Sequence, residues 1–356
     1  MRERISVRQI CFIMLIYTAV SKFITYPTQL SVVTGRDLLF SAAVNFIIEG
    51  VIIWAVSYLC SRTDKTLFGL IEGTLGNITA RIVYGLFALF FMVCALMPLL
   101  EQKVYVHAIF YDMLPSLVVF LPVFFFTVYA ASKGLENTGR CADICLPLFL
   151  IAMLFILVMS LHEIKWDNFL PMFKLPKKIF KGSLANTHRF AEPAYLAMFM
   201  GHFKYKKGDA AKITLSYIGG ALFVLAVLAA FYGVYGDMAE SRSFAISKIS
   251  LFFPAIDLIG RIDLLALYIL EIPMLFALVL NFQLAVHCIE ECTGYKNKFV
   301  LSLAVNAVFL TLLILLDNSF SKVNDVWSKW MWIVFIIFTI LIPLLSWAMR
   351  RKDGKG

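Results

Sequence analysis

Charged residues are scarce in this 356-residue sequence. Asp, Glu, Lys and Arg make up 15% of the chain, whereas hydrophobic residues make up 61%. A soluble domain typically carries about 25% charged residues, so a chain this apolar has too little polar surface to stay dissolved as a monomer. The shortage predicts a protein whose solvent is lipid. Because no long polar stretch is present either, we expect a single membrane domain over residues 1–356.

The sequence also lacks the usual patterns of catalysis and cofactor binding. No G-x-S-x-G, H-E-x-x-H or Walker-type loop occurs, and the five histidines are scattered. The seven cysteines form an odd set, and their two i, i+4 pairs match no common zinc pattern. We therefore predict no enzyme, no catalytic residues, no cofactor and no metal site. The net charge is +9, but no basic patch alternates with stacking aromatics, so nucleic-acid binding has no support.

Long apolar runs are what the sequence has instead. A membrane-crossing helix needs about 20 residues, with a range of roughly 17–25. Runs of this kind predict an all-α polytopic protein of about ten transmembrane helices. They lie near residues 9–33, 40–60, 80–105, 115–131, 143–161, 186–203, 211–236, 262–288, 299–316 and 327–348. The first run has a basic start but no clean cleavage site, so we interpret it as a retained helix.

The basic residues predict how the chain is oriented in the bilayer. With the N-terminus inside, the predicted inside segments hold more Lys and Arg than the outside segments, which favours both termini in the cytoplasm. Residues 350–356 then form a cytoplasmic tail. The basic loop at 165–181 is the main evidence against this orientation.

A loop at residues 163–183 divides the predicted spans into two sets of five. It contains two prolines and is therefore not one continuous helix. A 5+5 division places corresponding helices in opposite orientation, which is the LeuT-like arrangement of transporters built from inverted repeats. We expect the first repeat over residues 7–162 and the second over 184–349.

Polar residues interrupt the first span of each repeat, where such transporters hold their substrate between broken helices. In the first span, Ser21, Lys22 and Thr25 come just before Pro27. Lys22 lies about 14 residues after Arg8, or roughly 20 Å along a helix, and this depth favours a functional break. The alternative is a simple proline kink, with Lys22 reaching an interface.

In the sixth span, His188, Arg189 and Glu192 lie within five residues, and Pro193 follows. Ionisable groups inside a span are costly, so they usually face a cavity or a partner. The alternative is a boundary error that places this cluster at the outer surface. The ligand-binding candidates from the two breaks are Ser21, Lys22, Thr25, His188 and Glu192.

Two further carboxyl groups lie inside spans, Glu49 in the second and Glu271 in the eighth. Either one could pair with Lys22 or carry a proton. For both, the alternative is a buried ion pair that only fixes helix packing.

Short motifs in order along nearly the whole chain resemble those of the bacterial spore germination permeases. They are I-S-V-R-Q at 5–9, L-P at 114–115, G-L-E-N-T-G-R at 134–140, F-A-E at 190–192 and F-P-A-I-D-L-I-G-R-I-D at 253–263. This family comprises the B-type subunits of nutrient germinant receptors, within the amino acid–polyamine–organocation transporters. The resemblance implies a ten-helix fold with a 5+5 inverted repeat.

The resemblance also implies a function. It points to a receptor subunit in a bacterial cell membrane or spore inner membrane that senses a germinant, often an amino acid. It implies two partners, a larger membrane subunit and a lipoprotein. We expect Arg261 and Asp263 to form a structural ion pair at the start of the eighth helix. Two other functions stay open: a proton-coupled amino-acid transporter, and a non-binding scaffold for the partner subunits.

Overall fold

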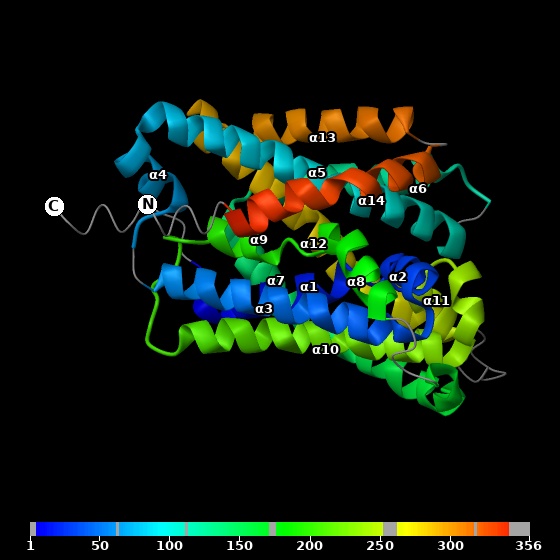
Figure 1. Cartoon of the computed structure of the whole chain (residues 1–356). Coiled ribbons are helices and arrows are strands. Elements are labelled where there is room, and N and C mark those ends of the chain that lie inside the picture. The colour runs from blue at the N-terminus through cyan, green and yellow to red at the C-terminus, as the bar shows by residue number, and fades with distance from the viewer. Residues whose placement is uncertain are drawn as a thin grey trace.

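The computed structural model of the chain is a bundle of helices (Figure 1). It describes residues 5–61, 64–110, 113–170, 176–251, 262–316 and 319–341. Within these ranges all regular structure is helical, and six helical stretches are long and apolar enough to cross a membrane. Shorter apolar helices accompany them, among them the helix at the start of the described chain.

The five predicted spans of the first half all correspond to helices. They are α1 (Val7–Val20) with α2 (Tyr26–Thr34), α3 (Leu38–Cys60), α5 (Asn77–Phe110), α6 (Ser116–Ala131) and α7 (Leu135–Ser160). A short α4 (Leu67–Leu75) connects α3 to α5. The predicted start of the fifth span at residue 143 is late, because α7 begins directly after Gly134, whose φ of 81° suits a glycine.

The second half repeats this pattern. Its helices are α8 (Pro176–Ala185) with α9 (Glu192–Met198), α10 (Asp209–Tyr235), α12 (Ile262–Thr293), α13 (Lys298–Leu315) and α14 (Phe320–Ile336), with a short α11 (Ala245–Ser250) between α10 and α12. The predicted loop at 163–183 thus ends in a helix. The sixth span begins with α8, ten residues before the predicted start at 186, because its first segment is too polar to look like a membrane helix.

The two ends of the bundle have different connections (Figure 1). At one end, here called the α4 end, the backbone amide of Ile5 donates a hydrogen bond to His202 O over 3.0 Å. At the other end, the α2 end, α2 packs against the 3₁₀ turn Gly236–Ser241 that follows α10. Helix α1 runs from the α4 end to the first break, in close contact with α10: a Cβ added to Gly220 would lie 2.6 Å from Leu15 O. This packing holds the first break in the centre of the bundle.

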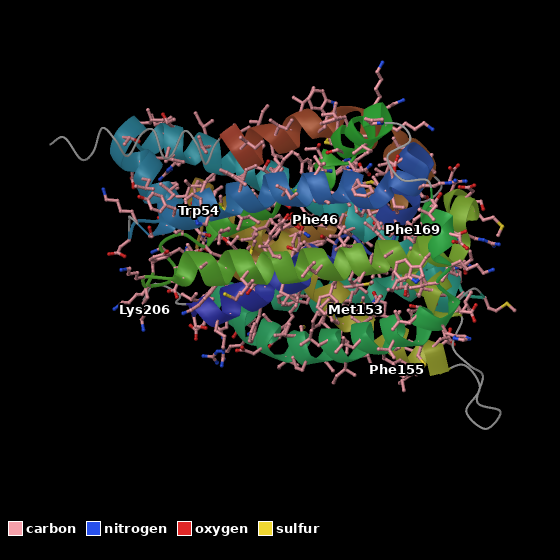
Figure 2. All side chains as sticks on the ribbon, turned by 60° about the horizontal axis from the view of Figure 1, so that its bottom comes forward. Phe46, Trp54, Met153, Phe155, Phe169 and Lys206 are labelled. Atoms are coloured by element: carbon pink, nitrogen blue, oxygen red, sulfur yellow. The ribbon has the colours of Figure 1, made fainter. Side chains whose placement is uncertain are left out.

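Large apolar side chains project from the flanks of the bundle, among them Trp54 on α3 (Figure 2). Lys206 lies at the α4 end and Phe169 near the α2 end. A soluble protein rarely exposes contiguous apolar surface of this extent. The flanks therefore suit contact with lipid.

Of the predicted ion pair at the eighth helix, Asp263 is buried in the first turn of α12. Arg261 lies outside the described residues, so the pair stays a prediction.

Candidate ligand site at two helix breaks

Both predicted helix breaks are present, and each is followed by a proline in the next helical segment. The first break separates α1, which ends at Val20, from α2, whose second residue is Pro27. The second separates α8 from α9, whose second residue is Pro193. Proline cannot donate a backbone hydrogen bond and disfavours helix at the residue before it. The breaks therefore have the same local cause in both halves of the chain.

A buried ion pair joins the two breaks. The Lys22 ammonium donates to Glu192 Oε1, and both side chains have 0% exposure. Lys22 also lies 4.8 Å from the ring centre of Phe190. Lys22 therefore does not reach an interface, and the His188–Glu192 cluster is not at the surface. These two alternatives to a functional break are excluded for the residues concerned.

Glu49 brings α3 to the same place. Its Oε1 accepts from the Glu192 backbone amide at 3.1 Å, and its Oε2 accepts from the Tyr217 hydroxyl of α10 at 2.7 Å. We call Lys22, Glu49, Glu192 and Tyr217 the bridge cluster. It contains one cation and two carboxyl groups, all buried. With both carboxyl groups ionised, the cluster would carry one net negative charge, and unpaired buried charge is costly. The cluster is electrically neutral when one of the two carboxyl groups carries a proton.

A second buried cluster lies next to the bridge cluster, toward the α2 end. The guanidinium of Arg189 makes a bidentate pair with Glu101 of α5, at 2.6 and 3.2 Å. It also donates to Thr25 Oγ1 and Gln29 Oε1, each at 2.8 Å. We call Thr25, Gln29, Glu101 and Arg189 the cap cluster. It ties both breaks to α5 and is balanced in charge.

Sequence reasoning missed Glu101. Its run of polar neighbours, Gln102 and Lys103, lies inside an otherwise apolar span, and all three side chains are buried. Polar residues within a membrane helix usually face the bundle interior. The interruption of the third span was therefore a usable signal.

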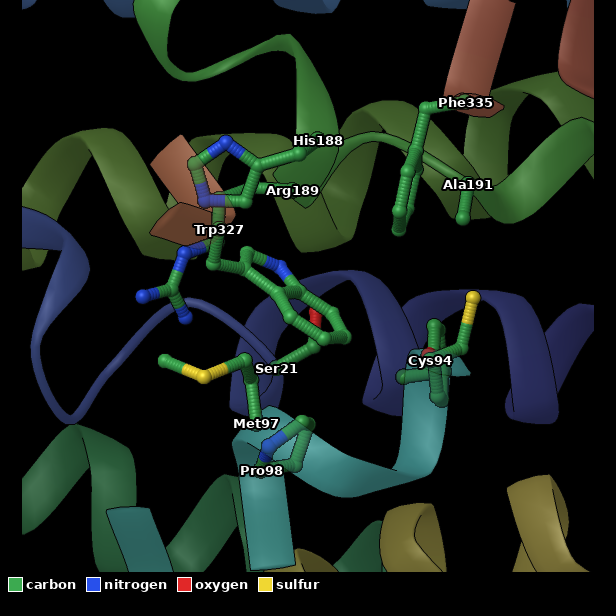
Figure 3. A pocket seen from close by; sticks show the side chains of 10 residues that line it. Ser21, Cys94, Met97, Pro98, His188, Arg189, Ala191, Trp327 and Phe335 are labelled. Atoms are coloured by element: carbon green, nitrogen blue, oxygen red, sulfur yellow. The ribbon is translucent and has the colours of Figure 1, made fainter. Parts of the chain in front are cut away.

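A cavity with both polar and apolar lining groups lies between the breaks (Figure 3). It is lined by Tyr17, Ser21, Cys94, Met97, Pro98, His188, Arg189, Ala191, Trp327 and Phe335. Arg189 has a buried Nε without a hydrogen-bond partner in the described structure. The volume is about 40 Å³, which is room for a few water molecules.

The predicted ligand-binding residues thus divide into two groups. Ser21 and His188 line the cavity, whereas Lys22 and Glu192 are bound to each other beside it and Thr25 belongs to the cap cluster. Tyr17 also lines the cavity. Its hydroxyl donates to that of Tyr195 at 2.5 Å, and Tyr195 donates to Asn281 of α12. The two tyrosines are further site residues that the sequence reasoning missed.

Glu271 lies on α12 away from this site. Lys22 pairs with Glu192 rather than with Glu271, and both carboxyl oxygens of Glu271 are buried without a hydrogen-bond partner in the described part of the chain. A role of Glu271 as a proton carrier stays a prediction, and such a role would not involve the helix breaks. Among the described residues, no group of three His, Cys, Asp or Glu could hold a metal ion.

Comparison with known proteins gives a family and a fold. A family model described as a spore germination protein matches residues 4–321. No curated protein matches the sequence. Among solved structures, MhsT in complex with L-phenylalanine is similar over 98% of this chain and 99% of its own, with a TM-score of 0.67 and 12% identity.

Two other solved structures show the same fold. A manganese transporter of Eremococcus coleocola is similar over 96% of this chain and 76% of its own, with a TM-score of 0.60 and 10% identity. A Na⁺-coupled sialic acid symporter is similar over 95% and 77%, with a TM-score of 0.51 and 12% identity. These likenesses confirm the predicted all-α, LeuT-like membrane fold with its broken first and sixth helices.

Proposed function

Because this chain belongs to the spore germination permease family, we propose that it is a permease-like membrane subunit of a germinant receptor. In this role it binds an amino acid or similar small solute and takes part in triggering germination. The observation that carries the proposal is the cavity between the two breaks, where a buried cation with a free donor meets hydroxyl and apolar groups. MhsT, which has the same fold, is described in complex with an amino acid, L-phenylalanine.

The cavity's chemistry matches two parts of an amino acid, its carboxylate and its side chain. The unpartnered Nε of Arg189 is a donor for a carboxylate, and Ser21 adds a hydroxyl to the lining. Met97 and Trp327 offer apolar surface for a side chain. Lys22 and Glu192 hold the two breaks together behind the cavity. They act on the ligand through the backbone that carries Ser21 and Arg189.

Binding requires the site to widen. Ligand pockets typically have volumes of about 300–1,000 Å³, far above the present 40 Å³. Two features close the cavity: the cap cluster toward the α2 end, and Trp327 and Phe335 of α14. A ligand that draws Arg189 away from Glu101 would open the first. This movement is how we expect ligand binding to change the shape of the subunit. In a non-binding scaffold, by contrast, the cavity would stay closed.

Direct binding is the test. The purified chain in lipid nanodiscs is titrated with each labelled amino acid, and M97W, which fills the cavity, is compared with M238W at the exposed turn after α10. We expect saturable binding of at least one amino acid by wild type and M238W, and none by folded M97W. If none binds to folded wild-type protein or to its complex with partner subunits, the scaffold function is favoured.

A proton-coupled amino-acid transporter is the second candidate, and the bridge cluster favours it. Lys22 pairs there with Glu192, whose backbone amide donates to a second buried carboxyl group, Glu49, so the cluster can gain or lose a proton as it rearranges. Uptake of labelled amino acid into proteoliposomes under an imposed inward proton gradient distinguishes the two functions. Uptake that stops when the gradient is removed indicates a transporter. Binding without uptake indicates a sensor subunit.

Location and partners complete the proposal. The subunit would lie in a bacterial cell membrane or spore inner membrane with both termini, and hence the α4 end, in the cytoplasm. Lysines and arginines gather at that end, where Arg8, Arg140, Lys204, Lys206 and Lys212 line a broad recess. This distribution agrees with the excess of basic residues in cytoplasmic loops. A larger membrane subunit and a lipoprotein would complete the receptor.

A further inference from the structure

A second cavity, unrelated to the helix breaks, lies between α6, α7 and α12. Its volume is about 650 Å³, which is within the usual range of ligand pockets. It is lined by Phe126, Tyr129, Ala130, Lys133, Asn137, Thr138, Arg140, Cys141, Ile144, Cys145, Ile272, Leu275, Phe276 and Val279. We call it the α7 groove.

The α7 groove opens on the flank of the bundle. Phe126 and Tyr129 of α6, Ile144 of α7 and Ile272 of α12 line it and are exposed. In a membrane protein, exposed apolar side chains at this level face hydrocarbon. The walls of the groove therefore suit an acyl chain.

One end of the groove is basic. Lys133 follows α6, and its ammonium lies 4.4 Å from the ring centre of Tyr129. Arg140 lines the groove one turn into α7 and pairs with Glu136 at 2.6 Å. That pair is exposed and of the i, i+4 type, so it is weak and exchanges readily for another anion. An apolar groove that ends in two cations is complementary to an anionic head group on an apolar tail.

The length of the groove matches one leaflet. Along α7 its lining residues run from Asn137 to Cys145, which is about 12 Å at 1.5 Å per residue. Half of a hydrocarbon core about 30 Å thick is about 15 Å. The basic end lies toward the α4 end of the bundle, where α7 begins. The basic end of the groove thus lies where a lipid head group of the leaflet at the α4 end would lie, and the groove is about as long as that leaflet's hydrocarbon layer is thick.

We propose that the α7 groove binds an anionic phospholipid, with the phosphate between Lys133 and Arg140 and one acyl chain along α12. Basic pockets between transmembrane helices on the cytoplasmic side are suited to anionic head groups. A partner helix would also cover the apolar walls, but two cations at the mouth favour a phosphate over a second apolar surface.

The groove shares α12 with the candidate ligand site. Leu275, Phe276 and Val279 line the groove, whereas Ala277 and Asn281 of the same helix lie in a small cavity beside the breaks. A lipid in the groove therefore presses on the helix that carries Asn281, the partner of Tyr195. Bound lipid would hold α12 in one position against the site.

The test measures lipid retained by the purified full-length chain with native mass spectrometry. Phosphatidylglycerol and phosphatidylcholine with the same acyl chains are titrated separately, and inorganic phosphate is added as a competitor without a tail. We compare wild type with K133Q/R140Q and with A130F, which narrows the groove. The matched control, K207Q/K296Q, removes the same charge at exposed positions outside the groove.

We expect one tightly retained phosphatidylglycerol, bound about 30-fold more weakly by K133Q/R140Q and unchanged in the control, since each of the two basic residues near a membrane surface contributes about 1 kcal/mol. A130F should weaken both lipids, and phosphate should not displace the bound lipid. Equal retention of both lipids by wild type, or equal loss in the control variant, would overturn the proposal. If inorganic phosphate displaced the bound phosphatidylglycerol, the groove would be a site for anions in general and not for a lipid.

Discussion

The bridge cluster and the cap cluster connect the same two helix breaks, yet they differ in charge and in access. The bridge cluster places two carboxyl groups against one lysine, and its ion pair is completely buried away from the cavity. The cap cluster pairs one arginine with one glutamate, and Arg189 lines the cavity. Both clusters tie a break to a neighbouring helix, α3 through Glu49 and α5 through Glu101.

In the sequence, ionisable residues beside a proline mark both breaks in the same way, but the structure gives the two clusters different surroundings. Ionisable residues at a helix break can support the fold or meet a ligand. An ion pair with 0% exposure cannot meet a ligand without breaking, so we propose the bridge cluster as the structural element and the candidate proton carrier. An arginine with a free donor in a cavity can exchange its glutamate partner for a ligand, so we propose the cap cluster as the ligand-responsive element.

The largest effect should come from breaking the bridge. We expect K22M to lower the free energy of unfolding by about 3–5 kcal/mol, because two carboxyl groups then remain in the interior without their cation. Thermal unfolding in detergent measures it. The control is R140M, which removes a pair with Glu136 in which both side chains are exposed and which should cost less than about 1 kcal/mol. Equal losses would mean that the bridge has no special role.

A change in the cap that keeps its charge balance should lower ligand affinity rather than stability. R189K keeps the charge but loses the planar fork and the Nε donor, so we expect amino-acid affinity to fall about 10- to 100-fold, or about 1.5–3 kcal/mol. Equilibrium binding measures this loss. R36K, in the exposed pair with Asp237 at the α2 end, is the matched control and should bind normally. Unchanged affinity in R189K would remove Arg189 from the site.

Neutralising the extra carboxyl of the bridge should be tolerated. E49Q retains an oxygen for the Glu192 backbone amide, and its NH2 group can donate to the Tyr217 hydroxyl, which can turn to Phe46 O. It also removes the need for a proton, so we expect a stability change within about 1 kcal/mol. Any proton dependence of amino-acid uptake should disappear. E101Q, the corresponding change in the cap, should be clearly destabilising because it leaves Arg189 without its anion. If both variants behave alike, the charge difference between the clusters has no consequence.

The smallest effect should come from the hydroxyl in the cavity. S21A removes one neutral hydrogen-bonding group, so we expect amino-acid affinity to fall a few-fold, or about 0.5–1 kcal/mol, with stability unchanged. S61A, at the end of α3, provides the control for loss of a serine hydroxyl. A loss as large as that in R189K would place the main ligand contact at the first break instead of the second.

The position of the breaks was predictable because its cause is local. Pro27 and Pro193 act on their own backbone, and the polar residues beside them interrupt apolar runs that are evident in the sequence. The partners of those residues were not predictable in the same way. Lys22 had Glu49, Glu192 and Glu271 as possible anions, and spacing along the chain does not say which of three helices faces it. Glu101 was overlooked because nothing local links it to residue 189.

The sequence by itself determined the solvent and the architecture: low charge and ten apolar runs require lipid, and a bilayer leaves helices as the way to satisfy the backbone. It also determined where two of those helices break. Only the tertiary structure decided that Lys22 pairs with Glu192, that Arg189 pairs with Glu101, and that Ser21 rather than Lys22 lines the cavity. The physical reason is that helix periodicity fixes which residues share a face, whereas the rotation of each helix against its neighbours depends on packing along the whole bundle.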